Sequence, residues 1–118
     1  MRYLLIGLCV LMLLFAGVQY NDPDGLFWAI IYLIPGAFAA LAAFQPAALG
    51  GGIGRAALLT AIVAAIGAMI YYWPVTDQFW RVDVWWNTET AREGMGLMIA
   101  LLVLLVSLAG SRAKTRSA

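Results

Sequence analysis

The chain alternates between long apolar stretches and short polar connections. Four apolar stretches stand out, at residues 3–18, 26–44, 53–73 and 94–110. A helix needs about 20 mostly apolar residues to cross roughly 30 Å of membrane hydrocarbon, so each stretch predicts one transmembrane helix. We therefore expect residues 1–118 to form a single domain: an all-α membrane protein with four transmembrane helices in a compact bundle.

The composition agrees with this interpretation. Of the 118 residues, 64% are hydrophobic, 11% are charged and none is histidine. Average proteins are roughly 45–50% apolar and about 25% charged, so this chain lies far outside the soluble range. The formal net charge is only +1, and nothing in the sequence indicates a nucleic-acid partner. The expected surrounding of the chain is the lipid bilayer.

Charges of opposite sign collect at opposite ends of the apolar stretches. All six carboxylates fall in the first and third connections, and only two of the seven basic residues accompany them. Loops rich in Lys and Arg stay on the cytoplasmic side, so the pattern predicts a bacterial inner-membrane protein with both termini cytoplasmic and an acidic outer end. The carboxylates are Asp22, Asp24, Asp77, Asp83, Glu89 and Glu93; the five basic residues at the inner end are Arg2, Arg55, Arg112, Lys114 and Arg116.

Small residues and a proline predict how the helices pack. Pro35 lies inside the second apolar stretch, where we expect a kink or a close helix contact. The third stretch has small residues at helical spacing, among them Ala57, Ala61 and Ala65. In lipid, helices associate through such small faces, so we expect this helix to be tightly packed. The glycine-rich residues 45–54 between the two helices predict a flexible inner turn.

Two polar segments at the outer end form the candidate site. Trp28 and Tyr32 are four residues apart and share a helix face with Asp24. Arg92 stands at the start of the fourth helix, where a cation opposes the helix dipole and is expected to have carboxylate partners. The candidate residues are Gln19, Tyr20, Asn21, Asp22, Asp24, Trp28, Tyr32, Glu89, Arg92 and Glu93.

Three interpretations of this outer cluster stay open. In the first it is structural, because Asp22 precedes a proline as at a helix start and Thr90 with Glu93 matches a capping box. Arg92 then joins the two hairpins as a polar lock. In the second interpretation the carboxylates and Arg92 capture a small ligand or cation. In the third the cluster is a docking surface for a partner protein.

Metal and catalytic sites find little support in the sequence. Zinc, haem and iron sites need histidine or several cysteines, and Cys9 is the single cysteine. Calcium takes about 6–8 oxygen ligands, which the cluster could supply, but Arg92 among them opposes a cation. Ser107 has no histidine to act as its base. We therefore expect a non-enzymatic protein without cofactor or metal.

The two polar segments also carry a family resemblance. Residues 18–24 read V-Q-Y-N-D-P-D, and residues 89–97 read E-T-A-R-E-G-M-G-L. Together with Trp28, Tyr32 and Pro35, these motifs resemble the transmembrane protein 220 family. The resemblance covers the whole chain and implies a small bundle of four membrane helices with a shared outer site. It implies no particular reaction.

The function expected from the sequence is that of an accessory or structural subunit. Such a protein packs against a larger membrane complex or lipid and is held together by its outer Asp/Glu/Arg lock. The alternative is a binding or transport-accessory protein that captures a small ligand or cation at the outer carboxylates.

Overall fold

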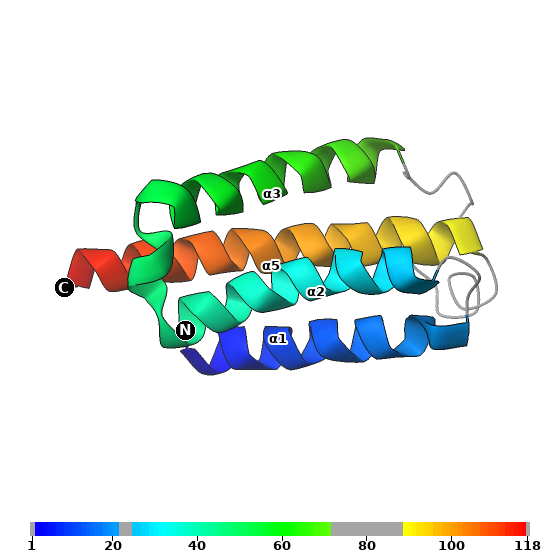
Figure 1. Cartoon of the computed structure of the whole chain (residues 1–118), viewed down its shortest axis with the longest axis horizontal. Helices are drawn as coiled ribbons and strands as arrows, with labels where there is room; N and C mark the ends of the chain where they lie inside the picture. The colour runs from blue at the N-terminus through cyan, green and yellow to red at the C-terminus, as the bar shows by residue number, and fades with distance from the viewer. Residues whose placement is uncertain (1, 22–24, 72–88, 118) are drawn as a thin grey trace.

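The computed structural model describes residues 2–21, 25–71 and 89–117, with side chains at 2–19, 25–71 and 93–111. Within these ranges the chain is almost entirely helical and has no strand, which confirms the predicted all-α bundle (Figure 1). The elements in chain order are α1 (Arg2–Gly17), the 3-10 helix η1 (Val18–Asn21), α2 (Gly25–Phe44), the 3-10 helix η2 (Pro46–Leu49), α3 (Gly52–Tyr71) and α5 (Glu89–Ser117).

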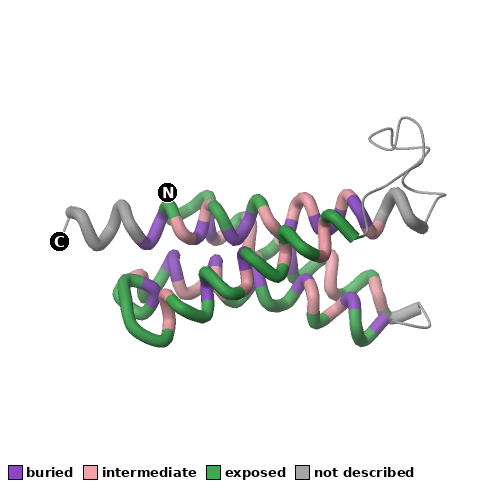
Figure 2. The backbone as a smooth tube through the Cα atoms, turned by 90° about the horizontal axis from the view of Figure 1, so that it is seen from above, coloured by how far each residue is buried: buried purple, intermediate pink, exposed green. Residues whose placement is uncertain are grey.

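The helices lie side by side, with α5 at the centre of the bundle. Helix α1 packs along α2, and α5 packs on α2, α3 and α1 (Figures 1 and 2). Helix α3 rests on α5 and η2 and has very little contact with α2. The N-terminal end of α1 and the C-terminal end of α5 lie at the same end of the bundle (Figure 1). We call this end, which holds Arg2 and Arg55, the inner end and the opposite one the outer end, after the sides expected from the sequence.

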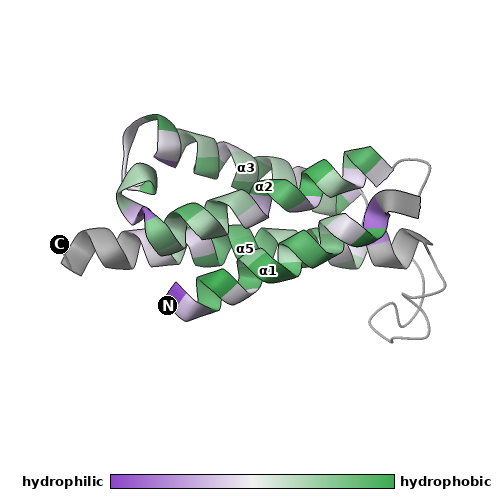
Figure 3. Cartoon of the chain, turned by 60° about the horizontal axis from the view of Figure 1, so that its bottom comes forward, coloured by the Kyte–Doolittle hydropathy of each residue, from purple (hydrophilic) through white to green (hydrophobic). Residues whose placement is uncertain are grey.

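Three helices are long and apolar enough to cross a membrane: α2, α3 and the part of α5 from Glu93 to Ser111. Helix α1 is apolar but has only 16 residues, about 24 Å at 1.5 Å per residue. The 3-10 helix η1 adds four residues and roughly 8 Å, so the two together match a hydrocarbon thickness of about 30 Å. Apolar residues fill the lengths of the helices, and hydrophilic ones gather toward the ends (Figure 3).

The proline of α2 marks a close helix contact. Pro35 and Gly36 are both buried within an unbroken helix. A Cβ atom at Gly36 would lie 3.1 Å from Cβ of Met12 in α1, so the missing side chain lets the two helices approach. Met12 itself is fully buried. The close helix contact expected at this position is therefore observed.

The inner turn is more ordered than the glycine-rich sequence predicts. Pro46 begins η2, whose backbone is closed by hydrogen bonds from Ala48 N–H to the Gln45 carbonyl at 3.0 Å and from Gly50 N–H to the Ala47 carbonyl at 3.1 Å. Leu49 is fully buried and fixes the turn to the bundle. The prediction of a flexible turn missed this apolar anchor. Glycine is needed at Gly52, which begins α3 with φ +61°.

The packing predicted for α3 is found on one side of the helix only. Ala61 and Ala65 are half-buried against the core, whereas Ala57 is exposed. Only Leu58 and Ile62 of this helix are buried, whereas α5 buries Leu97, Val103 and Leu104 among others. Helix α5 is also longer than the apolar stretch at 94–110, because its polar ends continue the same helix beyond the hydrocarbon.

Candidate functional site

The structure places part of the predicted outer cluster. Trp28 and Tyr32 are buried in α2, with 3% and 5% of their surfaces exposed, and Glu93 is half-buried at the start of the apolar part of α5. Gln19 donates from Nε2 to the Phe15 carbonyl oxygen at 3.0 Å, so its amide closes the end of α1. The side chains of Tyr20, Asn21, Asp22, Asp24, Glu89 and Arg92 lie outside the described residues, and the polar lock stays a prediction.

Aromatic rings occupy the described outer part of the bundle. The ring of Tyr32 lies edge-on to Phe15 of α1, with ring centroids 5.3 Å apart and an interplanar angle of 82°. Trp28 lies one turn earlier in α2, 6.2 Å from Tyr32, and Phe27 meets Trp28 edge-on at 5.6 Å. Edge-to-face pairs of this kind contribute about 0.5–1.5 kcal/mol beyond their buried area. Phe15 escaped the sequence prediction because a phenylalanine in an apolar stretch carries no polar signal.

Tyr32 also reaches the central helix. A Cβ atom built on Gly96 of α5 would collide with the Tyr32 hydroxyl and would lie 2.9 Å from the ring carbon that bears it. Gly96 therefore provides the space in which Tyr32 crosses from α2 onto α5. The next residue, Leu97, is buried at 2% exposure. The tyrosine thus joins α1, α2 and α5 at the outer end of the bundle.

A second polar contact holds the inner end. Arg55, in the first turn of α3, donates from Nε to the Leu49 carbonyl oxygen at 2.6 Å and from Nη2 to Ser111 Oγ of α5 at 3.5 Å. Ser111 is fully buried and its hydroxyl bonds the Leu108 carbonyl at 2.9 Å. Arg55 therefore ties the start of α3 to both elements on which α3 rests. From the sequence this arginine was interpreted only as a topology signal.

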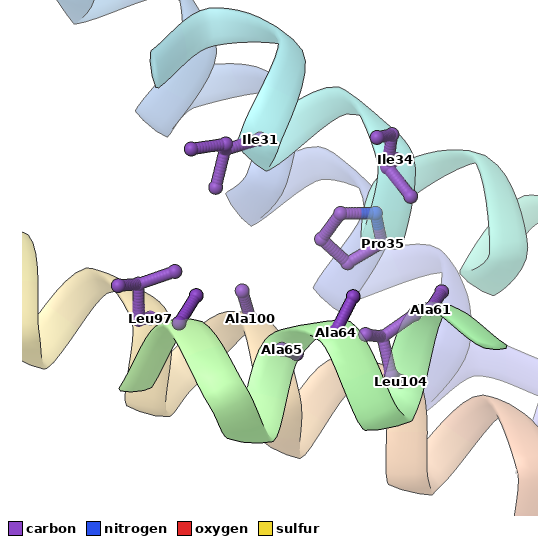
Figure 4. A pocket seen from close by; sticks show the side chains of 10 residues that line it. Ile31, Ile34, Pro35, Ala61, Ala64, Ala65, Leu97, Ala100 and Leu104 are labelled. Carbon is purple, nitrogen blue, oxygen red and sulfur yellow. The ribbon is translucent and has the colours of Figure 1, made fainter. Parts of the chain in front are cut away.

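An apolar slot lies between α2 and α3, with α5 as its floor (Figure 4). Its volume is about 180 Å³. One wall is formed by Ile31, Ile34 and Pro35, the other by alanines of α3, and the floor by Leu97, Ala100 and Leu104. The slot exists because α2 and α3 barely meet and because alanine side chains are too short to close the space between them.

A comparison with known protein families shows to which family the chain belongs. The model of a family described as Transmembrane family 220, helix, matches residues 11–109. The chain belongs to transmembrane family 220. No curated protein and no solved structure gives a match.

Membership in transmembrane family 220 makes this a membrane protein, and its apolar helices are in contact with lipid. The matched residues contain the aromatic group of α2, Gly96 and the apolar slot. They also contain both motifs on which the resemblance was based.

The described part of the chain offers no obvious place for a metal ion. No group of three His, Cys, Asp or Glu side chains lies together among the described residues. Among the described residues, the buried serines Ser107 and Ser111 donate their hydroxyls to carbonyls of their own helix. No buried side-chain nitrogen or oxygen in these ranges lacks a hydrogen-bond partner. The described polar groups thus stabilise helices and helix contacts.

Proposed function

We propose that this member of transmembrane family 220 is a non-enzymatic integral membrane protein that serves as an accessory or structural subunit. It resides in the bacterial inner membrane with both termini in the cytoplasm. Its helices pack against a helix of a larger membrane complex, and its outer Asp/Glu/Arg residues act as a polar lock that fixes the helix ends. The protein contributes helix packing to the complex, and any reaction is carried out by the partner.

The observation that carries this proposal is an uncovered face of α3. Ala56, Thr60 and Gly67 lie on one side of the helix at spacings of four and seven residues, and all three are exposed. We call them the small-residue face. A Cβ atom at Gly67 would meet nothing within 4 Å, and Thr60 directs its hydroxyl to the Ala56 carbonyl at 2.8 Å. Val63, exposed between Thr60 and Gly67, is the one branched apolar residue among them, and its side chain is short.

Such a face suits another helix better than it suits lipid. Lipid tails are as apolar as leucine, so hydrophobicity gives little reason for two membrane helices to associate. Close packing does, and small residues let two backbones approach. The branched residues Leu59 and Ile66 occupy the adjacent side of α3 and present an ordinary lipid-facing surface. The contrast between the two sides supports a partner on the small-residue face.

The orientation in the membrane rests on the inner-end arginines. Arg2 and Arg55 both lie at the inner end, together with the start of α1 and the end of α5. The Arg2 guanidinium carbon lies 5.1 Å from the centroid of the Phe44 ring. Glu93 lies at the other end of α5. The positive-inside rule then puts the termini in the cytoplasm.

The test is co-purification with a matched pair of variants. The tagged protein is extracted from native membranes in a gentle detergent, and retained proteins are quantified by mass spectrometry. Gly67→Leu blocks the small-residue face, and Gly7→Leu makes the same change at an open, exposed position of α1. We expect at least one membrane protein to be retained by the wild type and Gly7→Leu and lost with Gly67→Leu. Equal retention by both variants would contradict the proposal.

A further inference from the structure

We propose that the apolar slot holds one acyl chain of an anionic phospholipid, whose phosphate lies at Arg55. The inference is independent of the docking proposed above, because the slot opens between α3 and α2 whereas the small-residue face is the adjacent, uncovered side of α3. The argument rests on the shape of the slot, its depth in the membrane and the charge at one end of it.

The slot has the proportions of a hydrocarbon chain. On α3 it extends from Ala61 to Ala68, seven residues or about 10 Å along the helix axis. Its short length and its volume of about 180 Å³ suit part of one extended hydrocarbon chain better than a second helix about 10 Å wide.

The slot also has the right surroundings. Its lining residues are all apolar, and they come from the middle parts of α2, α3 and α5, away from both polar ends (Figure 4). The long dimension runs with the helices and thus across the bilayer, which is the direction of lipid tails. An acyl chain there removes the void between α2 and α3 without exposing a polar group.

Charge complementarity identifies the class of lipid. Arg55 lies six residues before Ala61, about 9 Å toward the inner end of α3 and hence near headgroup depth. Its two hydrogen bonds go to neutral acceptors, and no ion pair with a carboxylate involves it within the described residues. A guanidinium has five N–H donors, so three remain for a phosphate. Basic sites between helices on the cytoplasmic side favour anionic headgroups.

Binding is measured on the purified, delipidated protein. Native mass spectrometry and thermal melting are recorded with phosphatidylglycerol, with phosphatidylcholine of identical chains, and with dihexanoyl phosphatidylglycerol, whose chains are too short to follow the slot. We expect one phosphatidylglycerol to stay bound, with a saturable rise in melting temperature and about tenfold tighter binding than phosphatidylcholine. The short-chain lipid should give no such shift. Equal binding of all three lipids would overturn the proposal.

Variants separate the slot from the charge. Ala65→Leu fills the slot and should lower phosphatidylglycerol binding at least tenfold, whereas Ala37→Leu, the same change at an exposed position of α2 outside the slot, should leave it unchanged. Arg55→Lys and Arg55→Gln should lower the preference for phosphatidylglycerol over phosphatidylcholine, the glutamine more. If Ala65→Leu lowers stability without lipid, Ala68→Leu at the end of the slot repeats the test. If these slot variants bind lipid as tightly as the wild type does, an acyl chain is not the occupant of the slot. The same conclusion follows if the wild type is a dimer that these variants dissociate.

Discussion

The hydroxyl of Tyr32 lies directly over the backbone of Gly96, in the space that any other residue would fill with its Cβ atom. This contact joins the second helix of the chain to the last, across 64 residues of sequence. Tyr32 is also edge-on to Phe15 of α1, so a single buried side chain fixes three helices at the outer end. The described part of the candidate site is thus an aromatic contact that joins three helices.

The Tyr32–Gly96 contact predicts that Gly96→Ala destabilises the protein. The added methyl group has to displace a buried ring, and overpacking of this kind costs about 1–3 kcal/mol. Helix propensity works in the other direction, since alanine is favoured over glycine by up to roughly 1 kcal/mol within a helix. We expect a lower melting temperature in detergent for Gly96→Ala and no decrease for Gly7→Ala, where nothing lies within 4 Å.

A double-mutant cycle isolates the contact. The Tyr32 hydroxyl is the atom nearest to the added methyl group, so Tyr32→Phe should relieve part of the collision. Gly96→Ala should therefore cost less in the Tyr32→Phe background than in the wild type, with a coupling of about 0.5–3 kcal/mol. Additive effects of the two substitutions would mean that the helices do not meet at this point.

The inner turn offers an independent test of the packing of α3. A Cβ atom at Gly54 would collide with the carbonyl oxygen of Ala48 in η2, and the carbonyl carbon would lie only 2.9 Å away. Since both neighbours are backbone atoms, they cannot move aside without opening the turn. We expect Gly54→Ala to lower the melting temperature, and Gly51→Ala, at an open position three residues earlier, to change it little. Similar melting temperatures for the two variants would refute this arrangement.

Arg55 should matter more for stability than Arg2, although both are inner-end arginines. Arg55 bonds Leu49 and Ser111, and hydrogen bonds from a charged donor contribute roughly 1.5–3 kcal/mol at most when sheltered from water. Arg2 is exposed and makes a cation–π contact with Phe44, which is worth about 0.5–1 kcal/mol at such a site. The comparison is made by measuring the melting temperatures of Arg55→Ala and Arg2→Ala in the same detergent. An equal or larger decrease for Arg2→Ala would contradict the role of Arg55 in holding α3 to η2 and α5.

The sequence predicted the helices better than their packing. Span length and hydropathy are local properties, so the all-α membrane fold follows from the apolar stretches. Which alanines face a neighbour depends on where the other helices lie, and the pattern of Ala57, Ala61 and Ala65 is the same in a packed helix and an uncovered one. Leu49 illustrates the same limit, because one buried leucine turned an expected flexible segment into an ordered 3-10 helix.

The sequence also predicted only some of the residues of the candidate site. Trp28, Tyr32 and Glu93 were selected for their residue types, and the structure places both aromatics in the bundle interior and Glu93 half-buried on α5. Phe15 and Arg55 were missed as site or contact residues, since neither a phenylalanine in a membrane helix nor an arginine near a helix end is distinctive. Their roles come from partners distant in sequence, which spacing alone does not reveal.

The outer carboxylates predict a response to divalent cations that distinguishes the two functional classes. If Asp22, Asp24, Glu89 and Glu93 are satisfied by Arg92 and neighbouring donors, millimolar calcium or magnesium should leave the melting temperature unchanged. A bound cation would instead stabilise the protein by roughly 2.7 kcal/mol at a hundredfold excess over its dissociation constant. A saturable increase that disappears in Asp24→Asn or Glu93→Gln would favour the ligand-binding alternative.

The proposed role as an accessory subunit is tested most directly by photo-cross-linking in native membranes. A photoreactive amino acid is placed at Thr60, on the small-residue face, or at Leu59, on the adjacent branched side of α3. Both positions are exposed, and successive residues of a helix differ by about 100° in direction and only about 1.5 Å in depth. We predict a discrete protein adduct from Thr60 and only lipid adducts from Leu59. Lipid adducts alone from both positions would contradict the proposed role.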